Sequence, residues 1–316
     1  MTFSERVKNE LARRRKDGCP ECDYAELGGF IHTAGSIAIL GSQRLGVAVE
    51  VDQPAAARRV FSLAKGLFGI QSVIAVKRVS RFNRPNTYVV TLPPSPRIGE
   101  VLRRLHVLSD DGSLTPGVPW GLVQNRCCQR AYLRGAFVVR GYVSEPLKSY
   151  HLEIASNSKE HAMDLVKLAG KWGIRAKTTE HKQRHVLYAK GGEDVSLFLQ
   201  VIGAERALLE FENVRAMKSV RNLVNREVNC ETANVNKTVE AAAKQMEDIR
   251  TIDRAIGLDG LKKSLREVAL LRLEMPTATM GEIGNALTPA VSKSTVSYRF
   301  RKIAEIADEI RKRERS

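Results

Sequence analysis

The sequence has no long apolar run and no export signal at its start. None of its apolar stretches reaches the roughly 20 residues that a helix needs to span a bilayer. The segment from Met1 to Arg6 lacks the basic, apolar and small-residue regions of a signal peptide. Hydrophobic residues make up 43% and charged residues 27% of the 316 residues, as in an ordinary globular chain of two or three domains. We therefore expect a cytoplasmic protein with no membrane contact.

Acidic residues are scarce relative to basic ones. The chain has 35 Asp and Glu against 51 Lys and Arg, which gives a formal net charge of +16. Such an excess favours a polyanionic partner, nucleic acid first, over a merely soluble basic protein. An anionic membrane surface is disfavoured because no single long helix combines a wide apolar face with a dense basic face.

Cysteine is also scarce. The five cysteines form an odd set in a chain without an export signal, so we expect reduced thiols and no disulfide framework. Cys19 and Cys22 have the C-x-x-C spacing of half a zinc site, but a second C-x-x-C or H-x-x-x-H partner is absent. The adjacent pair Cys127 and Cys128 would complete such a site only through an unusual geometry, and Cys230 stands apart. The sequence therefore predicts no metal and no other cofactor.

One pattern occurs twice, at about residues 25–108 and 130–203. Each copy begins with a short helix rich in small residues, at 25–35 and 131–141, and equivalent leucines, Leu27 and Leu133, are 106 residues apart. Strand-like segments, a helix, further strands and a closing apolar helix follow in both copies. The strand-like segments are 46–51, 72–79 and 88–92 in the first copy and 150–155, 175–179 and 185–189 in the second. The sequence predicts an α-β-β-α-β-β-α unit repeated about a pseudo-twofold axis.

The two small-residue helices resemble the LAGLIDADG motif of homing endonucleases. The residues that carry the resemblance are Leu27, Gly29, Ile31 and Gly35 in the first helix and Leu133, Gly135, Phe137 and Gly141 in the second. Glycine permits two helices to approach backbone to backbone, and a terminal glycine can adopt a left-handed cap. The resemblance implies a saddle of β-strands of the kind that those enzymes lay over DNA. We call the two repeats together the platform.

The acids of that motif are missing. In the nucleases, the penultimate motif residue is acidic and holds divalent ions against the scissile phosphates. Here the equivalent residues are Ala34 and Arg140, so we predict a catalytically inactive platform and a protein that is not an enzyme. Arg134 and Arg140 are interpreted as phosphate-contacting cations or as intramolecular salt-bridge partners. A rival hypothesis is a nuclease that uses carboxylates elsewhere, namely Glu26, Glu50, Glu145 and Glu153.

A second signal lies in residues 258–316. Helical periodicity predicts helices over about 261–274 and 279–287, a turn at 288–291 and a third helix from Lys293 to about Ile310, with Ser292 as its N-cap. Val296, Phe300, Ile303, Ala304 and Ala307 form its buried face. The other sides present Lys293, Ser294, Thr295, Ser297, Tyr298, Arg299, Arg301 and Lys302.

These polar and cationic side chains can contact base edges and phosphates of double-stranded DNA. The arrangement resembles the helix-turn-helix of sigma-factor region four, and the alternative is a small helical bundle with a solvated basic end. The predicted fold class is α+β, a tandem LAGLIDADG-like repeat followed by an all-α helix-turn-helix domain. The predicted divisions are 1–108 with an N-terminal helix and the first repeat, a linker at 109–120, the second repeat at 121–212, linker helices at 213–257, and 258–316.

The combination of repeats without acids and a helix-turn-helix resembles the WhiA regulators of Gram-positive bacteria. The matching segments are 131–137, 150–154, Asn225-Arg226-Glu227-Val228-Asn229-Cys230-Glu231 with Ala233-Asn234, and Ser292-Lys293-Ser294 with Arg299. The resemblance implies a nucleoid-associated transcription regulator of promoters, with roles in cell division, chromosome segregation and sporulation. It also implies cooperation with RNA polymerase and its sigma factor, and with a WhiB-like iron–sulfur protein. An adaptor whose platform binds a protein remains an open alternative.

Overall fold

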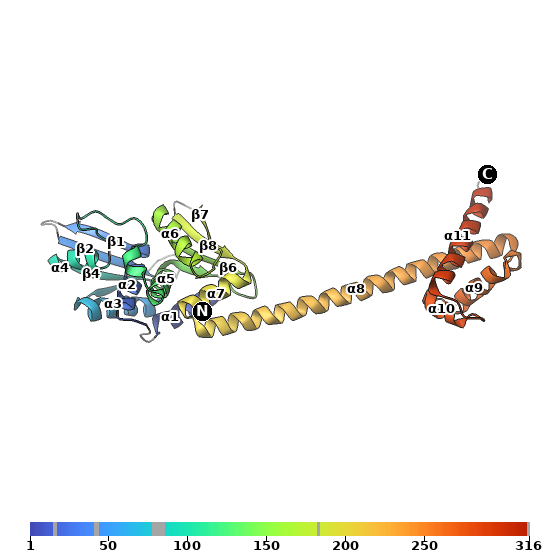
Figure 1. The fold of residues 1–316 in the computed structure, drawn as a ribbon, viewed down its shortest axis with the longest axis horizontal. Helices are drawn as coiled ribbons and strands as arrows, with labels where there is room; N and C mark the ends of the chain where they lie inside the picture. The colour runs from blue at the N-terminus through green and yellow to red at the C-terminus, as the bar shows by residue number, and fades with distance from the viewer. Residues whose placement is uncertain (15–17, 41–43, 78–85, 182–183, 315–316) are drawn as a thin grey trace. The chain divides into compact units, whose positions relative to one another are not determined.

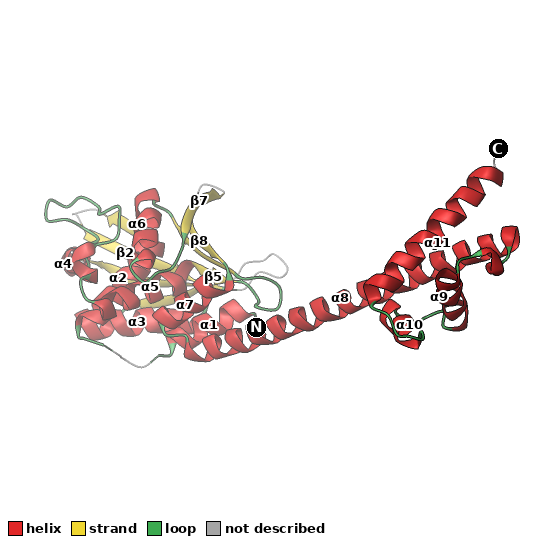
Figure 2. Cartoon of the chain, turned by 45° about the vertical axis from the view of Figure 1, so that its right-hand side comes forward, coloured by secondary structure: helices red, strands yellow, loops and turns green. Residues whose placement is uncertain are grey.

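The chain folds into two compact units. The computed structural model describes residues 1–14, 18–40, 44–77, 86–181 and 184–314. Its units are Met1–Lys218 and Ser219–Ser316, and their boundary falls inside helix α8 (Glu205–Ile256) (Figure 1). Among the described residues, strands occur in the N-terminal unit alone, and the C-terminal unit is helical (Figure 2). None of the described helices is both long and apolar enough to cross a membrane.

The N-terminal unit contains the predicted repeat. After α1 (Phe3–Ala12), the first copy comprises α2 (Glu21–Ala34), β1 (Gly35–Leu40), β2 (Arg44–Val51), α3 (Pro54–Phe68), β3 (Val73–Lys77), β4 (Thr87–Ser95) and α4 (Pro96–Arg104). After a 3-10 turn (Trp120–Val123), the second copy comprises α5 (Arg126–Arg140), β5 (Gly141–Val143), β6 (His151–Ser156), α6 (Lys159–Gly170), β7 (Lys177–His181), β8 (Arg184–Lys190) and α7 (Gly192–Ile202). The predicted α-β-β-α-β-β-α order is confirmed in both.

The two antiparallel sheets have the same topology. Their strand orders are β1-β2-β4-β3 and β5-β6-β8-β7. The sequence located the three later strands of each sheet to within a few residues; residues 78–79 of the expected strand 72–79 lie outside the described residues. It did not locate β1 and β5, which start at the last glycine of each motif helix. Alternate residues of the central strands enter one core that is continuous through both repeats.

Glycines allow α2 and α5 to pack backbone to backbone. A Cβ at Gly29 would collide with the carbonyl oxygen of Tyr132, and one at Gly135 with that of Glu26. This close approach was predicted. The predicted left-handed caps are wrong, because Gly35 and Gly141 have extended backbones with φ of −72° and −78°. Glycine is needed there because a Cβ would strike the carbonyl oxygen four residues earlier in each helix.

The C-terminal unit is built on the predicted helices. It comprises the end of α8, a 3-10 turn (Leu258–Gly260), α9 (Lys263–Glu274), α10 (Met280–Ala286) and α11 (Lys293–Glu314). Val296, Phe300, Ile303 and Ala307 of α11 are buried as predicted, whereas Ala304 is half-buried. They pack against the buried side chains Ile249, Ile252, Leu265, Val268, Ala269 and Ile283. This unit therefore has a core of its own.

Candidate nucleic-acid interface

Helices α10 and α11 form a helix-turn-helix, and side chains cap the N-terminus of each helix. Thr279 and Glu282 make a reciprocal capping box at the start of α10, with the Thr279 N–H donating to the Glu282 carboxylate at 2.6 Å. The hydroxyl of Ser292 accepts from the Thr295 N–H at 3.3 Å, as predicted for the N-cap of α11. A Cβ at Gly284 would collide with the Val291 carbonyl oxygen, so this glycine lets the turn lie against α10. These local contacts fix how α11 begins.

A buried arginine locks the segment between α9 and α10. Arg272 is only 2% exposed, and its guanidinium lies 5.3 Å from the centre of the Phe300 ring. It donates to the carbonyl oxygens of Met275, Pro276 and Ala278 at 3.3, 3.3 and 2.6 Å. Burial lowers the pKa of this guanidinium. The sequence predicts a helix over about 261–274 but not this role of Arg272, because an arginine between leucines gives no periodic signal.

The exposed side of α11 carries the predicted contact residues. Lys293, Ser294, Tyr298 and Arg301 are exposed, while Thr295, Ser297, Arg299 and Lys302 are half-buried. The segment 293–302 contains four cations and no carboxylate. Because α11 turns its apolar side to the core, its polar side is available at the helix start, where recognition helices meet base edges.

Four of these side chains also form hydrogen bonds or ion pairs within the unit, namely Ser294, Thr295, Arg299 and Lys302. The Arg299 guanidinium donates to the Ser264 carbonyl oxygen at 3.4 Å, and Lys302 Nζ lies 2.6 Å from the Glu305 carboxylate. The Thr295 hydroxyl lies 3.0 Å from that of Ser292. Tyr298, with 56% of its surface exposed, is therefore a better candidate for a base contact than Arg299.

An alanine and an arginine occupy the ends of the two motif helices in the platform. Ala34 is buried at the end of α2, and Arg140 at the end of α5 lines a hollow together with Lys8, Asp52 and Arg184. Burial and the nearby charge of Arg184 lower the pKa of Arg140, and its buried Nε has no hydrogen-bond partner among the described residues. Lys8 Nζ lies 2.7 Å from Asp52 Oδ2. A divalent ion at this position would meet a guanidinium in place of the missing carboxylates.

The other arginine of the platform pair is an internal ion-pair partner. Arg134 is 4% exposed, and its guanidinium lies 3.2 Å from the carboxylate of Glu26, itself 1% exposed. The same carboxylate receives two hydrogen bonds of 2.9 Å from Arg59 of α3. The side chain is enclosed between α2, α3 and α5, so its position does not favour the interpretation of Arg134 as a phosphate-contacting cation. The alternative interpretation, an intramolecular salt bridge, holds.

The carboxylates of the rival nuclease hypothesis are all engaged elsewhere. Glu26 is held by the two arginines, Glu50 lies 3.1 Å from Lys77, and Glu153 lies 2.6 Å from His151. Glu145 accepts the Phe3 N–H at 3.2 Å. Among the described residues, no three of the Asp, Glu and His side chains gather closely enough to hold one ion.

The cysteines lie differently from the prediction. From the sequence, Cys127 and Cys128 are expected to complete the half site of Cys19 and Cys22 only through an unusual geometry, and no metal is predicted. The structure brings the two pairs together. Burial raises the pKa of the Cys22 thiol to about 12 and that of Cys128 further. A backbone hydrogen bond at Cys19 lowers the pKa of Cys127 to about 7. Among the described residues, these four Sγ atoms form the donor set that suits a metal ion.

Comparisons with known families cover nearly the whole chain. Residues 20–108 match the WhiA N-terminal LAGLIDADG-like domain, residues 129–221 the WhiA LAGLIDADG-like domain, and residues 224–307 the WhiA C-terminal HTH domain. A probable cell division protein WhiA of Desulfitobacterium hafniense is 44% identical over 310 residues, covering 98% of this chain and 96% of its own.

Solved structures give the same result for the fold. Full-length WhiA from Thermotoga maritima superposes with a TM-score of 0.61 at 28% identity, covering 98% of this chain and 99% of its own. A structure of the N-terminal LAGLIDADG domain of WhiA superposes with a TM-score of 0.53 at 25% identity, covering 67% of this chain and 96% of its own. The full-length WhiA structure thus matches both the tandem LAGLIDADG-like fold and the helix-turn-helix of this chain, and the second structure matches the LAGLIDADG-like fold.

Proposed function

The chain belongs to the WhiA family, and from that premise we propose that it is a sequence-specific DNA-binding transcription regulator. The observation that carries the proposal is the asymmetry of α11. One side is buried in the helix-turn-helix core, and the other side offers hydroxyls, a tyrosine and four cations over residues 293–302. This combination suits contacts to base edges and to phosphates in a major groove. The net charge of +16 supports association with a polyanion.

The platform is proposed to be inactive as a nuclease. Ala34 offers no oxygen ligand, and Arg140 places a cation where an ion would bind. Purified protein with Mg²⁺ or Mn²⁺ is expected to bind duplex DNA and leave it uncut. Metal-dependent cleavage that disappears in Glu50→Gln or Glu153→Gln would support the rival hypothesis. The matched control is Glu193→Gln, a carboxylate exposed on α7.

The biological role is proposed from the family. Relatives carry the name of a probable cell division protein. For this chain we propose roles in cell division, chromosome segregation and sporulation, exerted at promoters in the cytoplasm on the nucleoid. RNA polymerase with its sigma factor and a WhiB-like protein are the proposed protein partners. The proposed divisions are repeats within 1–212, linker helices at 213–257 and the DNA-binding domain at 258–316.

Selection of binding sites from random duplex DNA with the full chain tests this function. We expect a defined sequence motif for the wild type. Tyr298→Ala should lose or broaden part of the motif, whereas Arg313→Ala, at the exposed end of α11, should recover the same motif. An unenriched pool for the wild type would contradict sequence-specific binding.

An adaptor function is the second candidate, and an exposed strand favours it. All five residues of β3 are exposed, including Val73 and Val76 at 59% and 52%. Exposed apolar side chains on a sheet suit a protein partner better than a phosphate backbone. Under the adaptor hypothesis, Val73→Lys with Val76→Lys leaves DNA affinity unchanged and removes a protein partner. A fall in the affinity for DNA would instead place DNA on this strand.

A further inference from the structure

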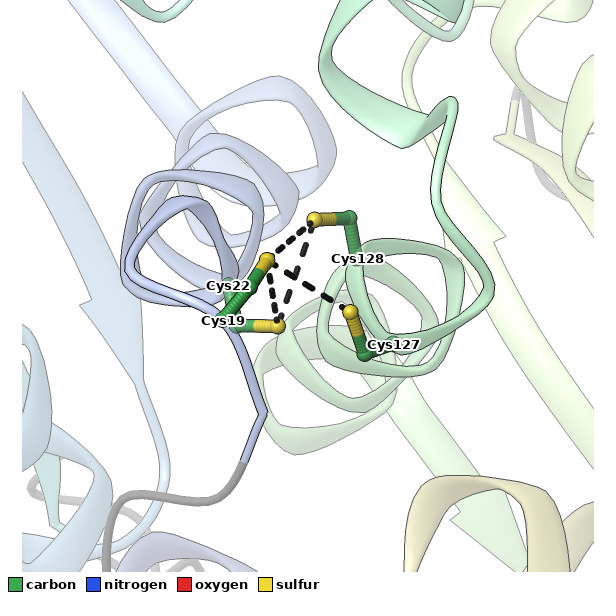
Figure 3. A group of neighbouring side chains, drawn as sticks. All are labelled: Cys19, Cys22, Cys127 and Cys128. Atoms are coloured by element: carbon green, nitrogen blue, oxygen red, sulfur yellow. Dashed lines mark hydrogen bonds between the residues drawn. The ribbon is translucent and has the colours of Figure 1, made fainter.

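Four cysteines from the two repeats meet at one end of the paired motif helices. Cys19 lies two residues before α2, ahead of the N-cap Pro20, and Cys22 lies in the first turn of that helix, while Cys127 and Cys128 lie in the first turn of α5. Figure 3 shows the four side chains directed toward one another from the two helices. Cys22 and Cys128 are buried, and Cys19 and Cys127 are half-buried. Water therefore reaches the cluster from one side only.

The distances between the sulfur atoms match a single tetrahedral ion. Cys19 Sγ lies 3.6 Å from Cys22 Sγ and 3.5 Å from the Sγ atoms of both Cys127 and Cys128. Cys22 Sγ and Cys128 Sγ are 3.9 Å apart, and all four atoms lie within 4.8 Å of one another. Four sulfurs at a zinc–sulfur distance of about 2.3 Å are separated by about 3.8 Å at the corners of a tetrahedron.

The surrounding backbone favours the same arrangement. Helices α2 and α5 both begin at the cluster. The positive end of each helix dipole therefore lies at the sulfurs, where it stabilises thiolates. Gly18 has a left-handed φ of +99°, and a Cβ there would lie 2.7 Å from Cys22 Sγ. The backbone of Gly18 thus lies directly against the sulfurs, which only glycine permits.

We propose that Cys19, Cys22, Cys127 and Cys128 bind one structural zinc ion that ties the first repeat to the second. Four thiolates satisfy a tetrahedral Zn²⁺ and leave no position for water or substrate, so the site is structural. Each thiol gives up its proton to solvent as it binds. An iron–sulfur cluster does not fit, since its several atoms would hold the ligand sulfurs farther apart than 4.8 Å.

The position of the ion separates it from the nuclease chemistry of the fold. The cysteines lie at the N-terminal ends of α2 and α5, and Ala34 and Arg140 lie at the C-terminal ends. Helices of 14 and 15 residues put about 20 Å between those ends at 1.5 Å per residue. The ion fastens the helix pair on which both repeats are built. Because its ligands are 109 residues apart between Cys19 and Cys128, binding couples to the docking of the two repeats.

Metal analysis of the full chain tests the site directly. The protein is purified under reducing conditions, loaded with zinc and passed over a chelating resin. We expect one zinc per chain, and cobalt in its place should give the visible absorption of a tetrahedral tetrathiolate complex. Cys230, exposed on α8, should react at once with a thiol reagent, and the other four cysteines only after the metal is removed.

Variants separate the site from the fold. Cys22→Ser and Cys128→Ser should each lose the zinc and lower the melting temperature, whereas Cys230→Ser should keep one zinc per chain. Retention of less than a tenth of an equivalent of zinc by the reduced wild type, with five cysteines equally reactive, would overturn the proposal. A disulfide within the cluster, or one bound iron in place of zinc, would overturn it as well. These measurements need no DNA and are independent of the proposed regulatory function.

Discussion

At the scale of single residues, the Glu26 carboxylate is the charge that joins three helices. It is buried with Arg134 and Arg59, which come from α5 and α3. Replacing it by alanine would remove the carboxylate that lies against these two guanidinium groups. Removal of one partner from a buried ion pair costs about 3–5 kcal/mol. Glu26 is therefore expected to stabilise the pairing of the two repeats. From the sequence, it is only a candidate carboxylate of the rival nuclease hypothesis.

The first prediction follows from this burial. Glu26→Ala should lower the free energy of unfolding by about 3–5 kcal/mol in chemical denaturation. Glu21→Ala, in the same helix, removes an exposed pair with Arg104 and should cost less than about 1 kcal/mol. Equal small effects of the two substitutions would show that the buried pair does not hold the repeats together.

Two buried histidines give the stability a dependence on pH. His161 accepts or donates at both ring nitrogens, with Tyr132 at 2.8 Å and Ser156 at 3.0 Å, and its ring stacks near that of His32. Burial lowers the pKa of His32 to about 4 and that of His161 to about 3. The folded chain keeps both rings neutral, whereas the unfolded chain takes up protons near the ordinary pKa of about 6.5.

The second prediction is a loss of stability on acidification. The contribution of each histidine is fully present above about pH 6.5 and is lost as the pH falls toward the folded pKa, at about 1.4 kcal/mol per pH unit. Denaturation midpoints of the wild type at pH 7.5, 6.5, 5.5 and 4.5 should show this slope. His161→Gln should flatten it, and His181→Gln, on the exposed strand β7, should not. An unchanged slope in His161→Gln would contradict the assignment.

At the scale of elements, the C-terminal helices depend on Arg272 for the segment that joins α9 to α10. Arg272→Met keeps the length of the side chain and removes its hydrogen bonds to the three carbonyl oxygens. Carbonyls left unsatisfied in a buried place cost about 1–3 kcal/mol. We expect faster amide hydrogen exchange in α9 to α11 and unchanged exchange in the N-terminal unit. Leu270→Ala, exposed on the same helix, is the control, and equal exchange in both variants would deny Arg272 this role.

The elements themselves were largely predictable, because their signals are local. Periodicity located α9, α10, α11 and most strands, and Gly29 and Gly135 indicated the close helix pair. The contacts between distant segments were not predictable in the same way. The cysteines meet only because α2 and α5 pair in register, and their spacing of more than 100 residues contains no trace of that register. Arg134 likewise acquires its partner through tertiary packing.

At the scale of the whole molecule, the chain has two separate hydrophobic cores. The N-terminal unit has a core shared by both repeats, and the C-terminal unit has a separate one. Residues 219–241 of α8 belong to neither core, and all of them are exposed. This stretch includes the segment around Asn225 to Asn234 that most specifically marks the family resemblance. Among the described residues, no other element covers those side chains.

We propose that α11 reads DNA sequence, and the specificity ratio of the full chain between two duplexes measures this property. Dissociation constants for a selected site and for a shuffled duplex are compared at one salt concentration for the wild type, Tyr298→Ala, Arg299→Ala and the control Arg313→Ala. Tyr298→Ala is expected to lose about 1–3 kcal/mol of binding free energy on the selected site and less on shuffled DNA. Its melting temperature should be unchanged. Lys302→Ala should weaken both alike and reduce the salt slope by about one. If Tyr298→Ala and Arg299→Ala both fold normally and still discriminate fully between the two duplexes, α11 does not read the sequence.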